Sequence, residues 1–131
     1  MDATERSIFE QFEFWSSAPL PSLRAQSAAD YVVVGCGSSY NLAMSIAATL
    51  NERGFPALAV PGNEWTRRPG SYKAHTKNSE VIAISRSGET TELIEAARQS
   101  RAAGLPLIAV TCDDRSSLIA NADHVMTAPT H

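Results

Sequence analysis

Two short segments rich in hydroxyl side chains each follow an apolar run and precede a stretch with helical periodicity. The first is Gly35-Cys36-Gly37-Ser38-Ser39, and the second is Ser85-Arg86-Ser87-Gly88-Glu89-Thr90. Hydroxyls can bond to the oxygens of an anion, and the backbone N–H groups at the start of a helix favour negative charge. Together the two segments predict a binding site for a phosphorylated ligand.

The first segment combines two glycines with two serines. Gly35 and Gly37 permit a tight turn, and Ser38 or Ser39 is expected to cap the helix that follows. The alternative without a ligand is a plain strand-to-helix turn with a serine cap. A dinucleotide fingerprint is disfavoured, because Tyr40 stands where that motif has its third glycine and no acid ends the next strand. The sequence has no G-K-[ST] Walker loop.

The second segment places three hydroxyls within six residues. Ser85, Ser87 and Thr90 can bond to several phosphate oxygens without a metal, and Arg86 can add a charge-assisted contact. Glu89 is expected in the first helical turn, where it makes an open anion site less favourable unless its side chain points away. Such a segment can also be a simple turn. Two of them on adjacent strands are a stronger indication of a site.

Few other residues offer chemistry. The candidate general bases are Glu64 and Glu89, each near the expected binding edge. Arg67 and Arg68 could reach a phosphate, although a solvated loop is the favoured interpretation.

The histidines and cysteines do not form a recognisable site. His75, His124 and His131 are far apart in the sequence and lack the spacing of metal ligands, so no metal or other cofactor is expected. Cys36 has no evident base and is interpreted as a small turn residue, not as a nucleophile. No C-x-x-C motif or disulfide framework includes Cys36 or Cys112.

The segments between these residues alternate between strand and helix patterns. Short apolar runs predict strands at 31–34, 57–60, 81–84, 107–111 and 124–126, with helices at 39–53 and 89–103. Gly54 and Gly104 are expected to terminate the two helices. Strands that are apolar throughout and alternate with helices indicate a parallel α/β sheet covered on both faces. Ligands of such sheets bind beyond the carboxyl ends of the strands, where both hydroxyl segments lie.

The N-terminal region has a different pattern. Residues 4–15 predict a helix with an apolar face made by Ile8, Phe9, Phe12 and Trp15, and two prolines interrupt the chain after it. We therefore expect an N-terminal helical arm over 1–30, with 22–30 as a short helix or loop, and a ligand-binding domain over 31–131. A covering helix would normally follow the fifth strand, so the chain is expected to be part of a longer protein.

The composition suits one ordinary domain. The chain has 131 residues, 44% of them hydrophobic, and a formal net charge of −3. This acidic balance argues against nucleic acid as a partner. No apolar run reaches the length of a membrane span and no signal peptide is evident, so a cytoplasmic setting is expected.

The two segments resemble the signatures of the SIS, or sugar isomerase, domain family. Within that family they are most similar to the isomerase half of glucosamine-6-phosphate synthase and to sugar-phosphate isomerases and deaminases, in which the segments read C-G-T-S and S-Q-S-G-E-T. The leader at 7–12 and the residues 63–65 also resemble this group. The resemblance implies a flavodoxin-like three-layer sandwich whose parallel sheet of about five strands has the order 2-1-3-4-5.

The resemblance also implies roles for individual residues. Ser85, Ser87 and Thr90 would hold the phosphate, and Ser38 and Ser39 would contact the sugar hydroxyls or the phosphate end. Arg86 stands where the family has Gln and is expected to favour a different sugar.

The catalytic groups of the family lie outside a segment of this length, and some come from the partner in a dimer. The chain is therefore expected to form a homodimer and to bind sugar phosphates without turning them over. The alternative is a non-catalytic domain that senses sugar phosphates for a regulator.

Overall fold

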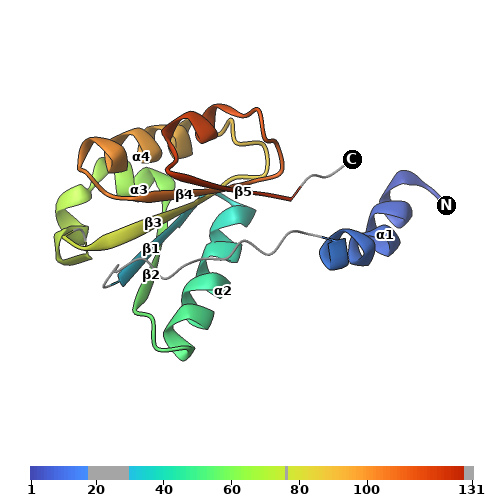
Figure 1. The fold of residues 1–131 in the computed structure, drawn as a ribbon, viewed down its shortest axis with the longest axis horizontal. Helices are drawn as coiled ribbons and strands as arrows, with labels where there is room; N and C mark the ends of the chain where they lie inside the picture. The colour runs from blue at the N-terminus through green and yellow to red at the C-terminus, as the bar shows by residue number, and fades with distance from the viewer. Residues whose placement is uncertain (18–29, 76, 129–131) are drawn as a thin grey trace.

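Five parallel strands form a single sheet in the computed structural model, which describes residues 1–17, 30–75 and 77–128 (Figure 1). The strands are β1 (Asp30–Gly35), β2 (Ala57–Pro61), β3 (Ser79–Ile84), β4 (Leu107–Thr111) and β5 (His124–Thr127). Their spatial order is β2-β1-β3-β4-β5, and every neighbouring pair is parallel. The predicted fold class and strand order are confirmed.

Helices cover both faces of the sheet, as strands that are apolar throughout require. The helical elements are α1 (Ala3–Ser17), α2 (Ser38–Glu52), α3 (Gly62–Arg67), η1 (Pro69–His75), α4 (Thr91–Ala102) and η2 (Ser117–Asn121). Figure 1 shows α2 on one face and α3 and α4 on the other. The predicted ends of α1, α2 and α4 are correct to within two residues. The sequence did not predict α3, η1 and η2, which are too short to show a helical period.

The core is divided into two clusters by the sheet. The first lies beneath α3, α4 and η2, and its largest members are Val32, Trp65, Val81, Leu93, Leu107 and Leu118. The second lies beneath α2 and consists of Val33, Ala43, Ala47, Ile82, Ile84 and Ile108. Alternate residues of one strand, such as Val32 and Val33, belong to opposite clusters. This alternation fixes the strand register, since a slip of one residue would exchange the two faces.

The helix ends follow the predicted glycines. Gly54 and Gly104 have φ angles of +85° and +76°, and each follows the last turn of its helix. The N–H of Phe55 donates to the Leu50 carbonyl, and that of Leu105 donates to the Ser100 carbonyl. These bonds satisfy carbonyls that a helix end leaves open, so both predicted C-terminal caps are confirmed.

The helix starts differ from the sequence expectations. The residue that caps α2 is Gly37, with φ of +57°, and the helix itself begins at Ser38 without a side-chain capping bond. The prediction of a serine cap is therefore wrong. Glu89 precedes α4, which begins at Thr91 after Thr90 as the N-cap residue. The placement of Glu89 in the first helical turn is also wrong.

A close approach between backbone segments explains Gly35 at the end of β1. A Cβ atom built on Gly35 would lie 2.6 Å from the backbone carbon and oxygen of Ser39 and 2.8 Å from the nitrogen of Tyr40. Backbone atoms cannot swing aside as a side chain can. Only glycine therefore lets α2 start directly against the end of β1.

The N-terminal helix α1 stands apart from the sheet (Figure 1). Its side chains Ile8, Phe9 and Phe12 are 53%, 68% and 60% exposed, although their spacing is that of a buried face. The predicted segment 22–29 and the side chain of Trp15 lie outside the described residues. In the part of the chain that the structure describes, no helix is long and apolar enough to cross a bilayer.

The loop between β3 and α4 packs tightly on the start of η2. Gly88 has φ of +66°, and a Cβ atom there would lie 2.1 Å from Ser116 Oγ and 2.3 Å from Ser116 Cβ. The N–H of Leu118 donates to the Gly88 carbonyl at 3.0 Å. Gly88 is thus required both for its backbone angle and for its lack of a side chain.

We predict that Gly88→Ala destabilises the protein more than Gly104→Ala. Both substitutions place a side chain at positive φ, which costs about 1–2 kcal/mol. Only Gly88 also faces a clash, since Gly104 has no atom within 4 Å of its Cβ position. Overpacking adds about 1–3 kcal/mol. Urea unfolding of the two variants measures the difference, and equal losses would contradict the predicted contact.

Glu89 connects this loop to η2. Its two carboxylate oxygens accept bonds from the N–H and the hydroxyl of Ser117, both at 2.7 Å. These hydrogen bonds lower the pKa of the Glu89 carboxyl below its ordinary value of 4.5. A group with a lowered pKa in the folded state stabilises the fold above its unfolded pKa, and that contribution disappears as the pH falls through the folded value.

We predict that Glu89→Gln makes the stability less dependent on pH in the acid range. The wild type should be more stable than the variant at pH 7, and the difference should shrink as the pH falls below 4.5. Urea midpoints at several pH values measure this trend. Glu95→Gln, on an exposed side chain of α4, serves as the control. A gap between wild type and Glu89→Gln that stays constant with pH would refute the role of the ionised carboxylate.

Candidate functional site

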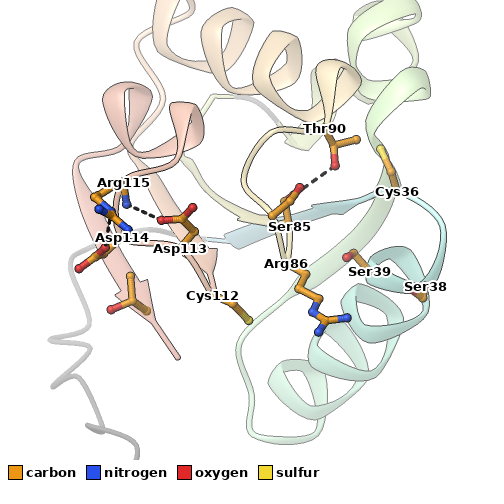
Figure 2. A pocket seen from close by; sticks show the side chains of 12 residues that line it. Cys36, Ser38, Ser39, Ser85, Arg86, Thr90, Cys112, Asp113, Asp114 and Arg115 are labelled. Atoms are coloured by element: carbon orange, nitrogen blue, oxygen red, sulfur yellow. Dashed lines mark hydrogen bonds and ion pairs between the residues drawn. The ribbon is translucent and has the colours of Figure 1, made fainter. Parts of the chain in front are cut away.

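A cavity of about 680 Å³ opens at the carboxyl edge of the sheet (Figure 2). Its lining is polar and comes from four places in the chain: Cys36, Ser38, Ser39, Ser85, Arg86, Ser87, Thr90, Cys112, Asp113, Asp114, Arg115 and Thr127. All six residues that the sequence singled out for ligand binding are among them. The structure thus brings the two hydroxyl segments together around one space.

The register of two central strands produces this convergence. Gly35, the last residue of β1, lies opposite Ile84, the last residue of β3. The two hydroxyl segments therefore leave the sheet at the same level and from adjacent strands. β1 and β3 are also the pair at which the connections of this sheet change direction, which is where open α/β sheets bind ligands.

Internal hydrogen bonds orient the hydroxyls of the β3–α4 loop. Ser85 Oγ accepts the Gly88 N–H at 3.0 Å and lies 3.2 Å from Thr90 Oγ1. Ser87 Oγ accepts the Glu89 N–H at 3.1 Å. The backbone N–H groups of Gly88 and Glu89 thus bond to the serines of their own loop.

These bonds leave hydroxyl protons for a ligand. A hydroxyl has one donor and two acceptor positions, and the serine oxygens use an acceptor position for the backbone. Ser87 therefore keeps its proton, while the pair of Ser85 and Thr90 has two protons and uses one between them. The loop presents O–H donors to the cavity, and donors are what the oxygens of an anion require.

Arg86 is held by its backbone and extends its side chain into the cavity. The Arg86 carbonyl accepts the Cys112 N–H at 3.0 Å and the Thr111 hydroxyl at 3.2 Å. Figure 2 shows the guanidinium extending from the β3 loop toward the side of the cavity formed by Ser38 and Ser39. The main chain at this position is fixed to β4 independently of the side chain.

The loop after β4 forms a rim that was not predicted from the sequence. Asp113 Oδ1 accepts the Arg115 N–H at 2.9 Å, and Arg115 Nε lies 4.0 Å from Asp114 Oδ1. Cys112 and Thr127 complete this side. A signal was available, because residues 112–115 directly follow a predicted strand at the same sheet edge. They were overlooked because hydroxyl side chains alone were taken as the mark of a phosphate site.

Cys36 lies at the bottom of the first loop. A Cβ atom on Gly62 would lie 2.7 Å from Cys36 Sγ, so the thiol packs against the start of α3. Burial raises the pKa of the Cys36 thiol, with a smaller opposing effect of a hydrogen bond from the Gly62 backbone. A raised pKa keeps the thiol protonated and unreactive, which fits its interpretation as a small turn residue.

The two proposed general bases do not line the cavity. Glu89 bonds to Ser117 as described, and Glu64 Oε2 lies 3.8 Å from Arg68 Nε on the surface of α3. Arg67 is the last residue of α3, so it belongs to a helix and not to the expected loop.

The histidines do not add to the site either. His124 begins β5 at the opposite edge of the sheet, while the His75 side chain and His131 lie outside the described residues. Among the described side chains, no group of three or more His, Cys, Asp or Glu residues could hold a metal ion.

Comparison with known proteins places this site in context. The chain is 30% identical over 123 residues to an arabinose 5-phosphate isomerase of Francisella tularensis, covering 94% of the chain and 36% of that enzyme. It is 29% identical over 94 residues to a glutamine–fructose-6-phosphate aminotransferase of Sulfurisphaera tokodaii, covering 71% and 15%. The chain thus spans only about a third or less of these curated relatives.

Solved structures share the fold over nearly the whole chain. An Escherichia coli CFT073 protein in complex with a phosphosugar superposes with a TM-score of 0.81 at 25% identity, covering 100% of this chain and 77% of that one. The Vibrio vulnificus NanR protein, complexed with ManNAc-6P, superposes with a TM-score of 0.74 at 18% identity, covering 97% and 49%. The SIS domain family model matches residues 26–131. Fold, signatures and family match agree, and the chain belongs to the SIS domain family.

Proposed function

We propose that this chain binds a sugar phosphate in the cavity at the carboxyl edge of its sheet. The observation that carries the proposal is the convergence of Ser38, Ser39, Ser85, Arg86, Ser87 and Thr90 on that single space. Membership of the SIS family and relatives named for phosphorylated sugars support the same ligand class.

In the proposed complex, the phosphate lies against the β3–α4 loop. Ser87 and the pair of Ser85 and Thr90 donate hydroxyl protons to its oxygens. Ser38 and Ser39, at the start of α2, contact the sugar hydroxyls or the phosphate end. The positive end of the helix dipole of α2 further favours the negative charge of the ligand.

We propose that the parent protein is an aldose–ketose isomerase or an amino-sugar-phosphate deaminase. Such a reaction opens the sugar ring and then transfers a proton between C1 and C2, which requires a base near both carbons. Neither Glu64 nor Glu89 faces the cavity. The base is therefore expected outside this chain, which matches only 36% of the Francisella isomerase. The parent works without a metal or other cofactor in this proposal.

The second candidate function is a sugar-phosphate sensor. The diversion of Glu89 to Ser117 favours it, because the cavity then holds the ligand without that carboxylate nearby. Incubating the full-length parent with each sugar phosphate and following aldose–ketose conversion by NMR separates the two functions. Binding without conversion supports the sensor.

We also propose that the protein is a homodimer in the cytoplasm. The exposed side chains of Ile8 and Phe9 on α1 support a partner surface, because adjacent large apolar groups on a helix gain free energy when they are covered. The thiols of Cys36 and Cys112 are free, which suits a reducing compartment.

The ligand class is tested by calorimetry on this chain and on its full-length parent. Glucosamine 6-phosphate, fructose 6-phosphate, galactosamine 6-phosphate and arabinose 5-phosphate form the panel, with the unphosphorylated sugars as controls. At least one phosphorylated sugar should bind, and its unphosphorylated form should not. A folded parent that binds none of the four would overturn the proposal.

Replacing Ser87 and Thr90 by alanine should weaken phosphosugar binding. Each lost hydrogen bond to a charged phosphate is worth about 1.5–3 kcal/mol. Calorimetry on S87A, T90A and the double variant measures the loss. Ser45→Ala, on the exposed surface of α2, is the matched control and should bind like the wild type. An unchanged affinity in the double variant would show that this loop does not hold the phosphate.

Phe9→Gln should shift the protein toward the monomer. The substitution removes an exposed apolar side chain from the proposed interface without altering the sheet. Sedimentation equilibrium measures the dimer dissociation constant, which should rise about tenfold or more. Met44→Gln removes a comparable exposed side chain from α2 and should have no effect. A wild-type monomer at all concentrations would refute the dimer.

A further inference from the structure

The charges around the cavity are unevenly distributed. Arg86 is the charged side chain on the side of the serines, whereas Asp113, Asp114 and Arg115 are grouped on the side of η2 (Figure 2). Arg115 contacts both aspartates of that rim, through its N–H to Asp113 and through Nε near Asp114. The rim therefore neutralises part of its own charge, while the serine side does not.

No carboxylate compensates Arg86. Among the described residues, the ion pairs within 4.0 Å do not include Arg86. Glu89, three residues further along the same loop, is the nearest acid in sequence, and both of its oxygens bond to Ser117. The fold thus removes the one acid of this loop from the serine side and leaves a guanidinium beside the hydroxyl donors.

We propose that Arg86 makes the cavity selective for doubly charged phosphate esters over singly charged or neutral groups. This inference rests on the proposed function and deepens it by naming the charge state of the ligand. Ser85, Ser87 and Thr90 donate neutral hydrogen bonds, which an ester of sulfate can accept as well as one of phosphate. A phosphate monoester carries a charge of about −1.5 to −2 near neutral pH, so the guanidinium interacts more strongly with it than with a sulfate ester.

The backbone at Arg86 makes the position suitable for a clean test. Its carbonyl holds the contacts to Cys112 and Thr111, and these contacts do not involve the side chain. Arg86→Gln should therefore keep the loop in place and remove only the charge. Arg86→Lys keeps the charge and removes the planar fork, so it separates charge from geometry. Arg115→Gln is the matched control, since it removes the same charge from the opposite rim of the same cavity.

The experiment compares paired ligands by calorimetry on the wild type and these three variants. The pairs are glucosamine 6-phosphate with glucosamine 6-sulfate, and arabinose 5-phosphate with arabinose 5-sulfate. Each measurement is made at low and high salt, because the contribution of an exposed charge is screened by ions. Thermal unfolding checks that the variants are as stable as the wild type.

The wild type should bind the phosphate ester about tenfold or more tightly than the sulfate ester, a ratio of the size that one charged hydrogen bond gives. In Arg86→Gln this ratio should approach one and lose its salt dependence, whereas Arg86→Lys and Arg115→Gln should keep most of it. An unchanged ratio in Arg86→Gln, with phosphosugar binding intact, would overturn the inference and leave the proposed function standing. Failure of the wild type to bind any of the four ligands would overturn both.

Discussion

The parallel register of β1 against β3 is the constraint on which the site depends. Gly35 opposes Ile84, so the loops that follow the two strands start at one level and face one cavity. The register is held by the core, because alternate residues such as Val32 and Val33 lie in different clusters on opposite faces. Side chains buried far from the cavity therefore determine which hydroxyls meet in it.

Within this frame the loops are built from the main chain inward. Gly35 lets α2 begin against its own strand, and Gly88 lets the second loop press on Ser116. The hydroxyls of Ser85 and Ser87 accept backbone N–H groups, which fixes their oxygens and leaves protons directed elsewhere. The loops are thus ordered before a ligand arrives, and binding requires little additional ordering of the protein.

Much of this arrangement was predictable from the sequence, and the rest has identifiable physical reasons. Apolar runs and the glycines at 54 and 104 predicted the strands, the long helices and their ends, because these patterns are local. The cap at Gly37 and the diversion of Glu89 were not predictable in this way, since they depend on contacts with residues distant in sequence, such as Ser117. Six cavity residues were foreseen from their hydroxyl and cationic chemistry. The acidic rim at 113–115 was missed because aspartates after a strand also suit an ordinary turn.

The carbonyl anchoring at Arg86 has a consequence for how such a site can change over time. Position 86 contributes its structural contacts through the main chain alone, so almost any residue other than proline can occupy it without disturbing β4. Mutations there escape the usual coupling between new function and lost stability. A single codon can therefore alter what the cavity recognises while the scaffold remains intact. Positions of this kind allow one domain to diversify its ligands in small, reversible steps.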